Sequence, residues 1–263
     1  MASSGTDWRH GRWPSCPRNT AFAWAIALQR RRSRTLIVVA YRAGMSFSPL
    51  SALAPSAYLA ACPIIEVDHP EVRALGAELR SASDSETECA HKAFEWVRDN
   101  VAHSYDARDP RVTLRASEVL DQRVGLCYAK SHLLAAILRG NGIPTALCYQ
   151  RLTHGDGHVL HGLVAVHLEG AWHRQDPRGN RADVSAEFSL GEERLAFPVD
   201  PQLGEVDYPE LHRSPAGAII NALSNTTDIL AIYDQGLPSH LGGPISEHAR
   251  SRSMRPRPGA AFR

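Results

Sequence analysis

Three side chains in the middle of the chain have types and settings that together could perform nucleophilic acyl chemistry. Cys127 follows Gly125 at the start of an apolar run, His161 heads a strand-like run, and Asp176 ends the next such run. A thiol attacks as its thiolate, which needs a histidine as base and an acid that orients the imidazole. We therefore take Cys127, His161 and Asp176 as candidate catalytic residues.

Cys127 lies in the expected first turn of an amphipathic helix. Gly125 supplies the turn before this helix, and the glycines of the run 139–142 end it. The inner face should carry three aliphatic residues, Leu134, Ile137 and Leu138. A helix N-terminus has partial positive charge and free N–H groups, which favour a thiolate and a developing oxyanion. The alternative is that Cys127 is a small buried apolar residue.

The two runs that carry the histidine and the aspartate read as a hairpin with Glu169-Gly170 at its tip. In that register Asp176 lies opposite Leu163, and diagonal to His161 on the same face. His173 falls on the other face. The pairing therefore selects His161 with Asp176, and a slip of one residue would separate them.

The remaining histidines raise the alternative of a metal site. His154, His158, His161 and His167 could be ligands, but no helical histidine pair or cysteine pair accompanies them. We therefore predict no metal and no cofactor. We expect His167 to be structural, although it shares the face of His161.

The elements that must position these residues follow from periodicity and caps. Helices are expected over 68–79, from Ser85 to about 101 with a Ser85/Glu88 capping box, over 116–120, 127–139, 216–223 and 230–233. Strands are expected over 145–152, 161–168 and 171–175, with a His/Gly loop at 153–160. Helices that precede strands predict an α+β fold, in which the cysteine helix packs on an antiparallel sheet.

Bulk properties exclude several classes of protein. The chain has 263 residues, 43% hydrophobic and 22% charged, with a net charge of +1. That composition is globular, and the balanced charge gives no reason to expect a nucleic acid partner or an anionic membrane. No apolar run reaches the roughly 18 residues that span a bilayer. The sequence gives no oligomeric state.

The five cysteines suggest a reducing compartment. They are widely spaced and form no CxxC pair: Cys16, Cys62, Cys89, Cys127 and Cys148. Reduced thiols in this pattern are typical of cytoplasmic proteins. We expect Cys62, Cys89 and Cys148 to be buried and inert.

Arginine-rich ends flank the ordered sequence. Residues 1–44 are expected to be a disordered or misassigned N-terminal extension, and residues 241–263 a basic disordered tail. A single domain is expected over 45–240, with its core at 85–185.

Four motifs within that core resemble the transglutaminase-like superfamily, which is related to papain. They are Gly125-Leu-Cys127-Tyr-Ala-Lys-Ser, Arg139-Gly-Asn-Gly-Ile-Pro144, His161-Gly-Leu-Val-Ala-Val and Gly170-Ala-Trp-His-Arg-Gln-Asp176-Pro. The resemblance implies a papain-like fold with Cys127 as nucleophile, His161 as base and then acid, and Asp176 orienting the imidazole. By the same analogy, Gln122 is a candidate oxyanion donor, and a solvated glutamine at a helix end is its alternative.

The resemblance also implies a class of reaction. Family enzymes form a thioester with a carbonyl and release an amine, after which water or another amine resolves the thioester. The sequence therefore predicts a cysteine hydrolase or peptidase that acts on amide bonds of a peptide or protein substrate. A protein-glutamine γ-glutamyltransferase and a non-catalytic binding or scaffold domain of the same fold are the alternatives.

Overall fold

The computed structural model describes residues 49, 52–233 and 236–242. The predicted extension at 1–44 lies outside the described residues, as does the predicted tail from residue 243 onward. Within the described part, no helix combines the length and the apolar character needed to cross a membrane.

Helices dominate the first half of the described chain. They and two short strands are η1 (Pro55–Tyr58), α1 (Pro70–Ser81), α2 (Glu86–Asn100), β1 (Ala102–His103), α3 (Ser104–Ala107), α4 (Ala116–Gln122), β2 (Val124–Gly125) and α5 (Cys127–Gly140). The hydroxyl of Ser85 accepts the N–H of Glu88, which confirms the predicted start of α2.

Strands follow, and short helices close the domain. These elements are β3 (Thr145–His154), β4 (Gly157–Leu168), β5 (Ala171–Gln175), η2 (Pro201–Leu203), β6 (Val206–Asp207), α6 (Gly217–Ser224) and α7 (Ile229–Tyr233). The order of strands in the sheet is β5-β4-β3-β6, and all three pairs are antiparallel. Helices before an antiparallel sheet confirm the predicted α+β class.

The hairpin that joins β4 to β5 has the predicted register. Leu168 pairs with Ala171, and Val164 pairs with Gln175. Its tip residues Glu169 and Gly170 both have positive φ, 53° and 81°, as a two-residue turn requires. Asp176 is the residue that directly follows β5.

The predicted loop at 153–160 is wrong, because all but two of these residues belong to strands. β3 and β4 pair continuously from Thr145 with Val166 to His154 with Gly157. Only two residues, Gly155 and Asp156, form the turn, and Gly155 has φ 55°. The histidines and glycines that suggested a loop lie on an end of the hairpin that is largely exposed.

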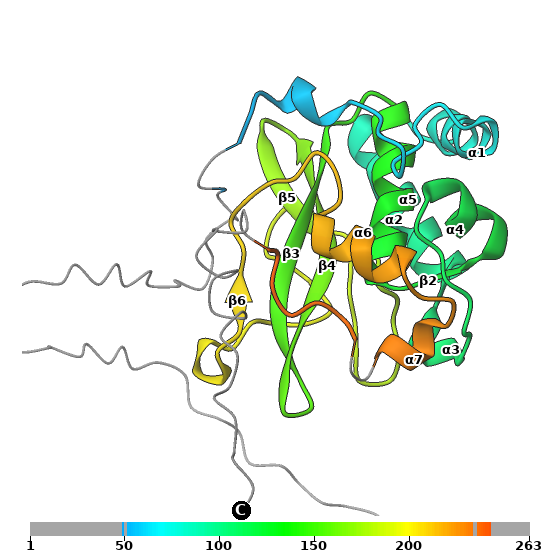
Figure 1. Cartoon of the computed structure of the whole chain (residues 1–263). Helices are drawn as coiled ribbons and strands as arrows, with labels where there is room; N and C mark the ends of the chain where they lie inside the picture. The colour runs from blue at the N-terminus through cyan, green and yellow to red at the C-terminus, as the bar shows by residue number, and fades with distance from the viewer. Residues whose placement is uncertain (1–48, 50–51, 234–235, 243–263) are drawn as a thin grey trace, which may run out of the picture. The chain divides into compact units, whose positions relative to one another are not determined.

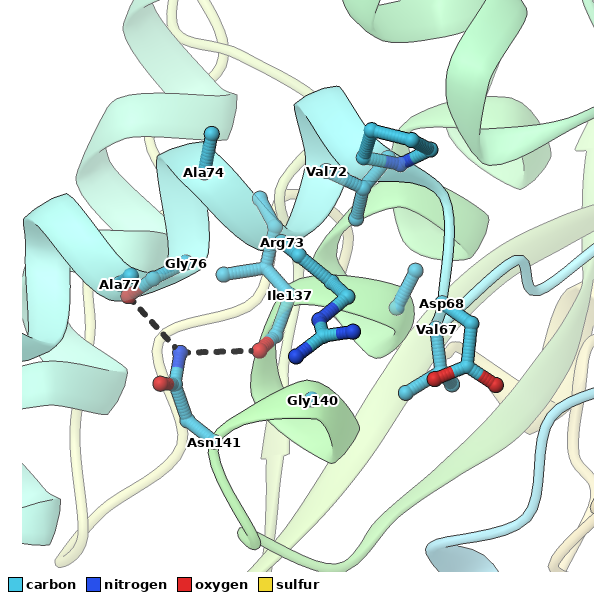
Figure 2. Close-up of a pocket in the computed structure, with 12 residues that line it drawn as sticks. Val67, Asp68, Val72, Arg73, Ala74, Gly76, Ala77, Ile137, Gly140 and Asn141 are labelled. Atoms are coloured by element: carbon cyan, nitrogen blue, oxygen red, sulfur yellow. Dashed lines mark hydrogen bonds between the residues drawn. The ribbon is translucent and has the colours of Figure 1, made fainter.

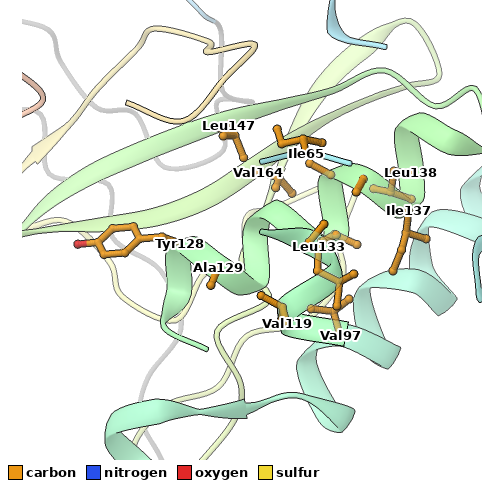
Figure 3. Packing of buried hydrophobic residues seen from close by; sticks show 14 of the residues in the cluster. Ile65, Val97, Val119, Tyr128, Ala129, Leu133, Ile137, Leu138, Leu147 and Val164 are labelled. Atoms are coloured by element: carbon orange, nitrogen blue, oxygen red, sulfur yellow. The ribbon is translucent and has the colours of Figure 1, made fainter. Parts of the chain in front are cut away.

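Helix α5 is the central element of the core. It packs on β3 and β4 on one side and on α1, α2 and α4 on the other. Figure 1 shows these helices grouped on one side of the sheet. In Figure 3, Leu133 of α5 lies near Val97 of α2 and Val119 of α4.

The predicted amphipathic character of α5 is therefore wrong. Every residue from Cys127 to Arg139 is buried, because neighbours cover the helix on both sides. Its buried polar groups bind backbone carbonyls instead of water. Lys130 Nζ donates to the carbonyls of Arg98 and Val101, and Ser131 Oγ donates to that of Gly162.

The opposite face of the sheet has a smaller cluster of its own, made of Tyr58, Ala146, Cys148, Leu163 and Ala165. The sheet is therefore covered on both faces. Cys89 and Cys148 are buried as predicted, whereas Cys62 is only half-buried.

Candidate active site

Cys127 is the first residue of α5, with Leu126 as the N-cap. The short strand β2 places it, because Gly125 pairs with His103 of β1. The side chain of a residue in the first turn lies close to N–H groups that have no partner within the helix. Cys127 is 7% exposed and lines a cavity.

The sulfur of Cys127 lies beside an open part of the β4 edge. β5 pairs with β4 only from Val164 to Leu168, so it does not cover the preceding residues of β4 on that side. There the backbone N–H of Gly162 points to Cys127 Sγ, with N and Sγ 3.5 Å apart. An N–H donor at this distance stabilises negative charge on sulfur.

His161 and Asp176 are joined by a short hydrogen bond. Nε2 of His161 lies 2.7 Å from Oδ2 of Asp176, and both side chains are buried. The carboxylate also accepts the backbone N–H groups of Arg178 and Ala196, each at 3.1 Å. Because Nε2 faces Asp176, Nδ1 is the ring nitrogen that is available to interact with the sulfur of Cys127.

The electrostatics favour a protonated imidazole. Burial alone lowers the pKa of His161, but the charge of Asp176, interaction with Cys127 and hydrogen bonds to both raise it to about 10. Burial raises the pKa of Asp176, and His161 with the two backbone N–H groups lowers it below its usual range. An imidazolium beside the sulfur stabilises a thiolate.

The cavity at Cys127 is bounded by the β3–β4 hairpin and by segments from outside the sheet. Phe197 packs edge-on to the His161 ring, with centroids 5.3 Å apart. Tyr105 of α3 and Tyr233 of α7 stack with centroids 3.9 Å apart and form another wall.

An ion pair between buried Arg178 and partly exposed Asp106 borders the same cavity. The guanidinium of Arg178 binds both carboxylate oxygens of Asp106, at 2.7 and 3.1 Å. Nearby His103 is also buried, and burial together with the charge of Arg178 lowers its pKa to about 3. His103 is therefore neutral at physiological pH, while Arg178 is paired.

The structure brings together Cys127, His161 and Asp176, but not Gln122. Gln122 ends α4, is half-buried and does not line this cavity. Sequence reasoning missed Gly162, Ala196 and Phe197. The motif at His161 contained Gly162, whereas Ala196 and Phe197 come from an irregular stretch with no local signal.

The other histidines make separate contacts. His154 lines the cavity, His158 Nε2 lies 2.9 Å from the carbonyl oxygen of Leu203, and the His167 ring packs on Trp172. Among the described residues, no group of three or more His, Cys, Asp or Glu side chains could hold a metal ion.

A second cavity lies between α1 and the end of α5 (Figure 2). None of its twelve lining residues is a cysteine or a histidine. Asn141 closes it by donating from Nδ2 to the carbonyls of Gly76 and Ile137, at 3.1 and 3.0 Å. This second cavity therefore offers no thiol for acyl chemistry, in contrast to the cavity at Cys127.

Comparison with solved structures finds distant similarities. A candidate cysteine protease of Cytophaga hutchinsonii has 17% identity and a TM-score of 0.44, over 61% of this chain and 47% of that one. The periplasmic domain of TgpA from Pseudomonas aeruginosa, bound to ethylmercury, has 22% identity and a TM-score of 0.37, over 46% of each chain. The chain thus spans about half the length of these structures. No curated protein matches the sequence significantly.

A family profile matches the part of the chain that carries the site. Residues 73–177 match the transglutaminase-like superfamily. This stretch runs from α1 to the residue after Asp176, and includes α5, β3, β4 and β5. The sequence of this core is therefore similar to that of the transglutaminase-like superfamily.

Proposed function

We propose that the protein is a cysteine hydrolase that cleaves amide bonds of a peptide or protein substrate through a thioester on Cys127. The observation that carries this proposal is the imidazole of His161, which hydrogen-bonds to Asp176 at 2.7 Å and also interacts with Cys127. Thiolate, imidazolium and carboxylate in this order are the groups that cysteine-dependent acyl transfer requires.

The first half-reaction forms the thioester. The thiolate of Cys127 attacks the amide carbon, and the carbonyl oxygen becomes an oxyanion. The backbone N–H of Cys127 is suited to stabilise that oxyanion, because first-turn N–H groups lack partners in the helix. His161 then gives its proton to the departing nitrogen, and the C–N bond breaks as the amine leaves.

The second half-reaction releases the acyl group. Neutral His161 accepts a proton from water as the water oxygen attacks the thioester carbon. Collapse of the intermediate breaks the C–S bond, so that a carboxylic acid leaves and the thiolate and imidazolium return. Asp176 holds the imidazole in one orientation through both halves and stays ionised.

Trapping of the acyl group tests this proposal. Purified protein is incubated with a peptide mixture, quenched in acid and mapped by mass spectrometry. We expect an acyl adduct on Cys127 that hydroxylamine removes and that Cys127→Ala lacks. Cys148→Ala is the matched control, because Cys148 is buried in the other face of the sheet and should not affect the adduct. Peptide cleavage that survives Cys127→Ala would contradict the proposal.

Isotope-labelled water identifies the acceptor. Hydrolysis places the label in the new carboxylate, even when a primary amine probe is present. Transfer of the acyl group to the amine in place of water would show a transferase.

A reducing compartment fits this chemistry, and we place the protein in the cytoplasm. The described cysteines, Cys62, Cys89, Cys127 and Cys148, are all free thiols. Detection of the native protein in a periplasmic or secreted fraction would contradict this placement.

A further inference from the structure

The edge of β4 next to His161 makes a main-chain hydrogen bond to a segment outside the sheet. The N–H of Leu160 donates to the carbonyl of Pro238, with N and O 2.7 Å apart. Leu160 directly precedes His161 in the sequence. β5 pairs only from Val164 onward, so Pro238 stands where a further strand residue would pair.

We call residues 236–242 the strap. The strap makes three further contacts. The side chain of Leu237 lines the cavity of Cys127 and packs against the core. Arg151 Nη1 on β3 lies 3.3 Å from Nε2 of His240. The N–H of Gly236 donates to the carbonyl of Ile232 in α7.

The main-chain bond of the strap is one-sided. Proline has no N–H, so Pro238 accepts from Leu160 but cannot donate in return. The carbonyl of Leu160 instead accepts the hydroxyl of Tyr128. A pair of strands normally exchanges two bonds at such a position, so the strap is held there by one bond fewer than a paired strand.

Proteins can bind extended peptides by adding them as a further strand at the edge of a sheet. We propose that the β4 edge beside His161 is the binding strand for the main chain of an extended peptide substrate, and that the strap occupies this edge until it is displaced. The proposal rests on the proposed function, since the bound peptide would present its carbonyl to Cys127. The strap is then an internal competitor for the N–H of Leu160.

Two alkylating probes, one small and one a peptide, test the proposal on the full chain. Iodoacetamide reports the reactivity of Cys127 alone, and a short peptide with an N-terminal iodoacetyl group reports access for an extended main chain. The measured quantity is the ratio of the two alkylation rates at Cys127. Preferential alkylation of Cys127 over Cys89 and Cys148 by iodoacetamide tests the proposed function separately.

Gly236→Ala should displace the strap without touching the site. A Cβ on Gly236 would stand 2.9 Å from Cβ of Ile232 and 3.2 Å from its Cα, so Gly236 must move away from Ile232. We expect the ratio of peptide to iodoacetamide rates to rise several-fold. Gly217→Ala is the matched control, because a Cβ there meets no atom within 4 Å. An unchanged or lower ratio in Gly236→Ala would overturn the proposal.

His240→Ala gives a second route that leaves the core intact. It removes the contact with Arg151, and the ratio should again rise, whereas His91→Ala on α2 should leave it unchanged. Equal rises in both rates would leave the ratio constant. Such a result would mean general loosening of the domain and would overturn the role of the strap.

Discussion

The backbone N–H of Gly162 points at the sulfur of Cys127, with the two atoms 3.5 Å apart. This contact joins the first turn of α5 to the part of the β4 edge that β5 does not cover. It also places the residue that follows His161 against the proposed nucleophile. No residue larger than glycine fits at position 162 without a shift of its neighbours.

Gly162→Ala should destabilise the fold and slow the reaction of Cys127. A Cβ on Gly162 would stand 2.7 Å from Cδ1 and 3.2 Å from Cα of Tyr128. Overpacking in a buried site costs about 1–3 kcal/mol, and β4 or α5 must shift. Urea unfolding and the rate of iodoacetamide alkylation measure the two effects. Gly140→Ala is the control, since its Cβ would meet Val67 at an ordinary 3.7 Å, and it should change neither.

The pair of His161 and Asp176 should make stability fall in alkali. The pKa of His161 rises from 6.5 to about 10 on folding, so between these values the native protein binds more protons than the unfolded chain. The stabilisation that results from the raised pKa is complete below pH 6.5 and is lost as pH approaches 10. In His161→Gln it is absent. Urea titrations across this range should show a mutational cost that shrinks with rising pH, and a constant cost would contradict the assignment.

The sequence could predict the parts of the site that depend on local geometry. The register of β4 with β5 follows from the turn at Glu169 and Gly170, and the register places Asp176 diagonal to His161. The start of α5 follows in the same way from Gly125 and the apolar run.

Contacts made by distant segments could not be predicted. The burial of Lys130 depends on carbonyls at the end of α2, and polar residues on α5 suggested an exposed face. Ala196, which binds Asp176, lies in an irregular stretch whose path no periodicity determines. The length of the β3–β4 hairpin was missed because its exposed end has a loop-like composition.

Lys130 should change the stability of the fold with pH in the opposite direction to His161, over an overlapping range of pH. Burial lowers its pKa from 10.5 to about 7, so from pH 7 to 10.5 the unfolded chain binds more protons and stability rises with pH. Lys130→Met removes this rise, and the mutational cost should grow in alkali, which is opposite to the trend for His161→Gln. It also leaves the carbonyls of Arg98 and Val101 without their donor, at about 1–3 kcal/mol each. Urea unfolding at several pH values checks both effects.

Asp106→Asn should destabilise the wall of the cavity. Arg178 is only 3% exposed and would keep a buried charge without its carboxylate partner. Because the Asp106 side chain is 27% exposed, water screens part of the loss, and we expect about 2–3 kcal/mol instead of the 3–5 kcal/mol typical of a fully buried pair. The backbone N–H of Arg178 also binds Asp176, so a shift of Arg178 should slow alkylation of Cys127.

Asp109→Asn is the matched control for that loss, since it removes a carboxylate from the same part of the chain. The Asp109 carboxylate pairs with Arg111, whose side chain is 52% exposed, so solvent takes over much of the interaction. Asp109→Asn should therefore cost much less stability than Asp106→Asn and leave the alkylation rate of Cys127 unchanged. Equal losses in the two variants would mean that the Arg178 pair acts as an ordinary surface pair, and that the charge of Arg178 is solvated without Asp106.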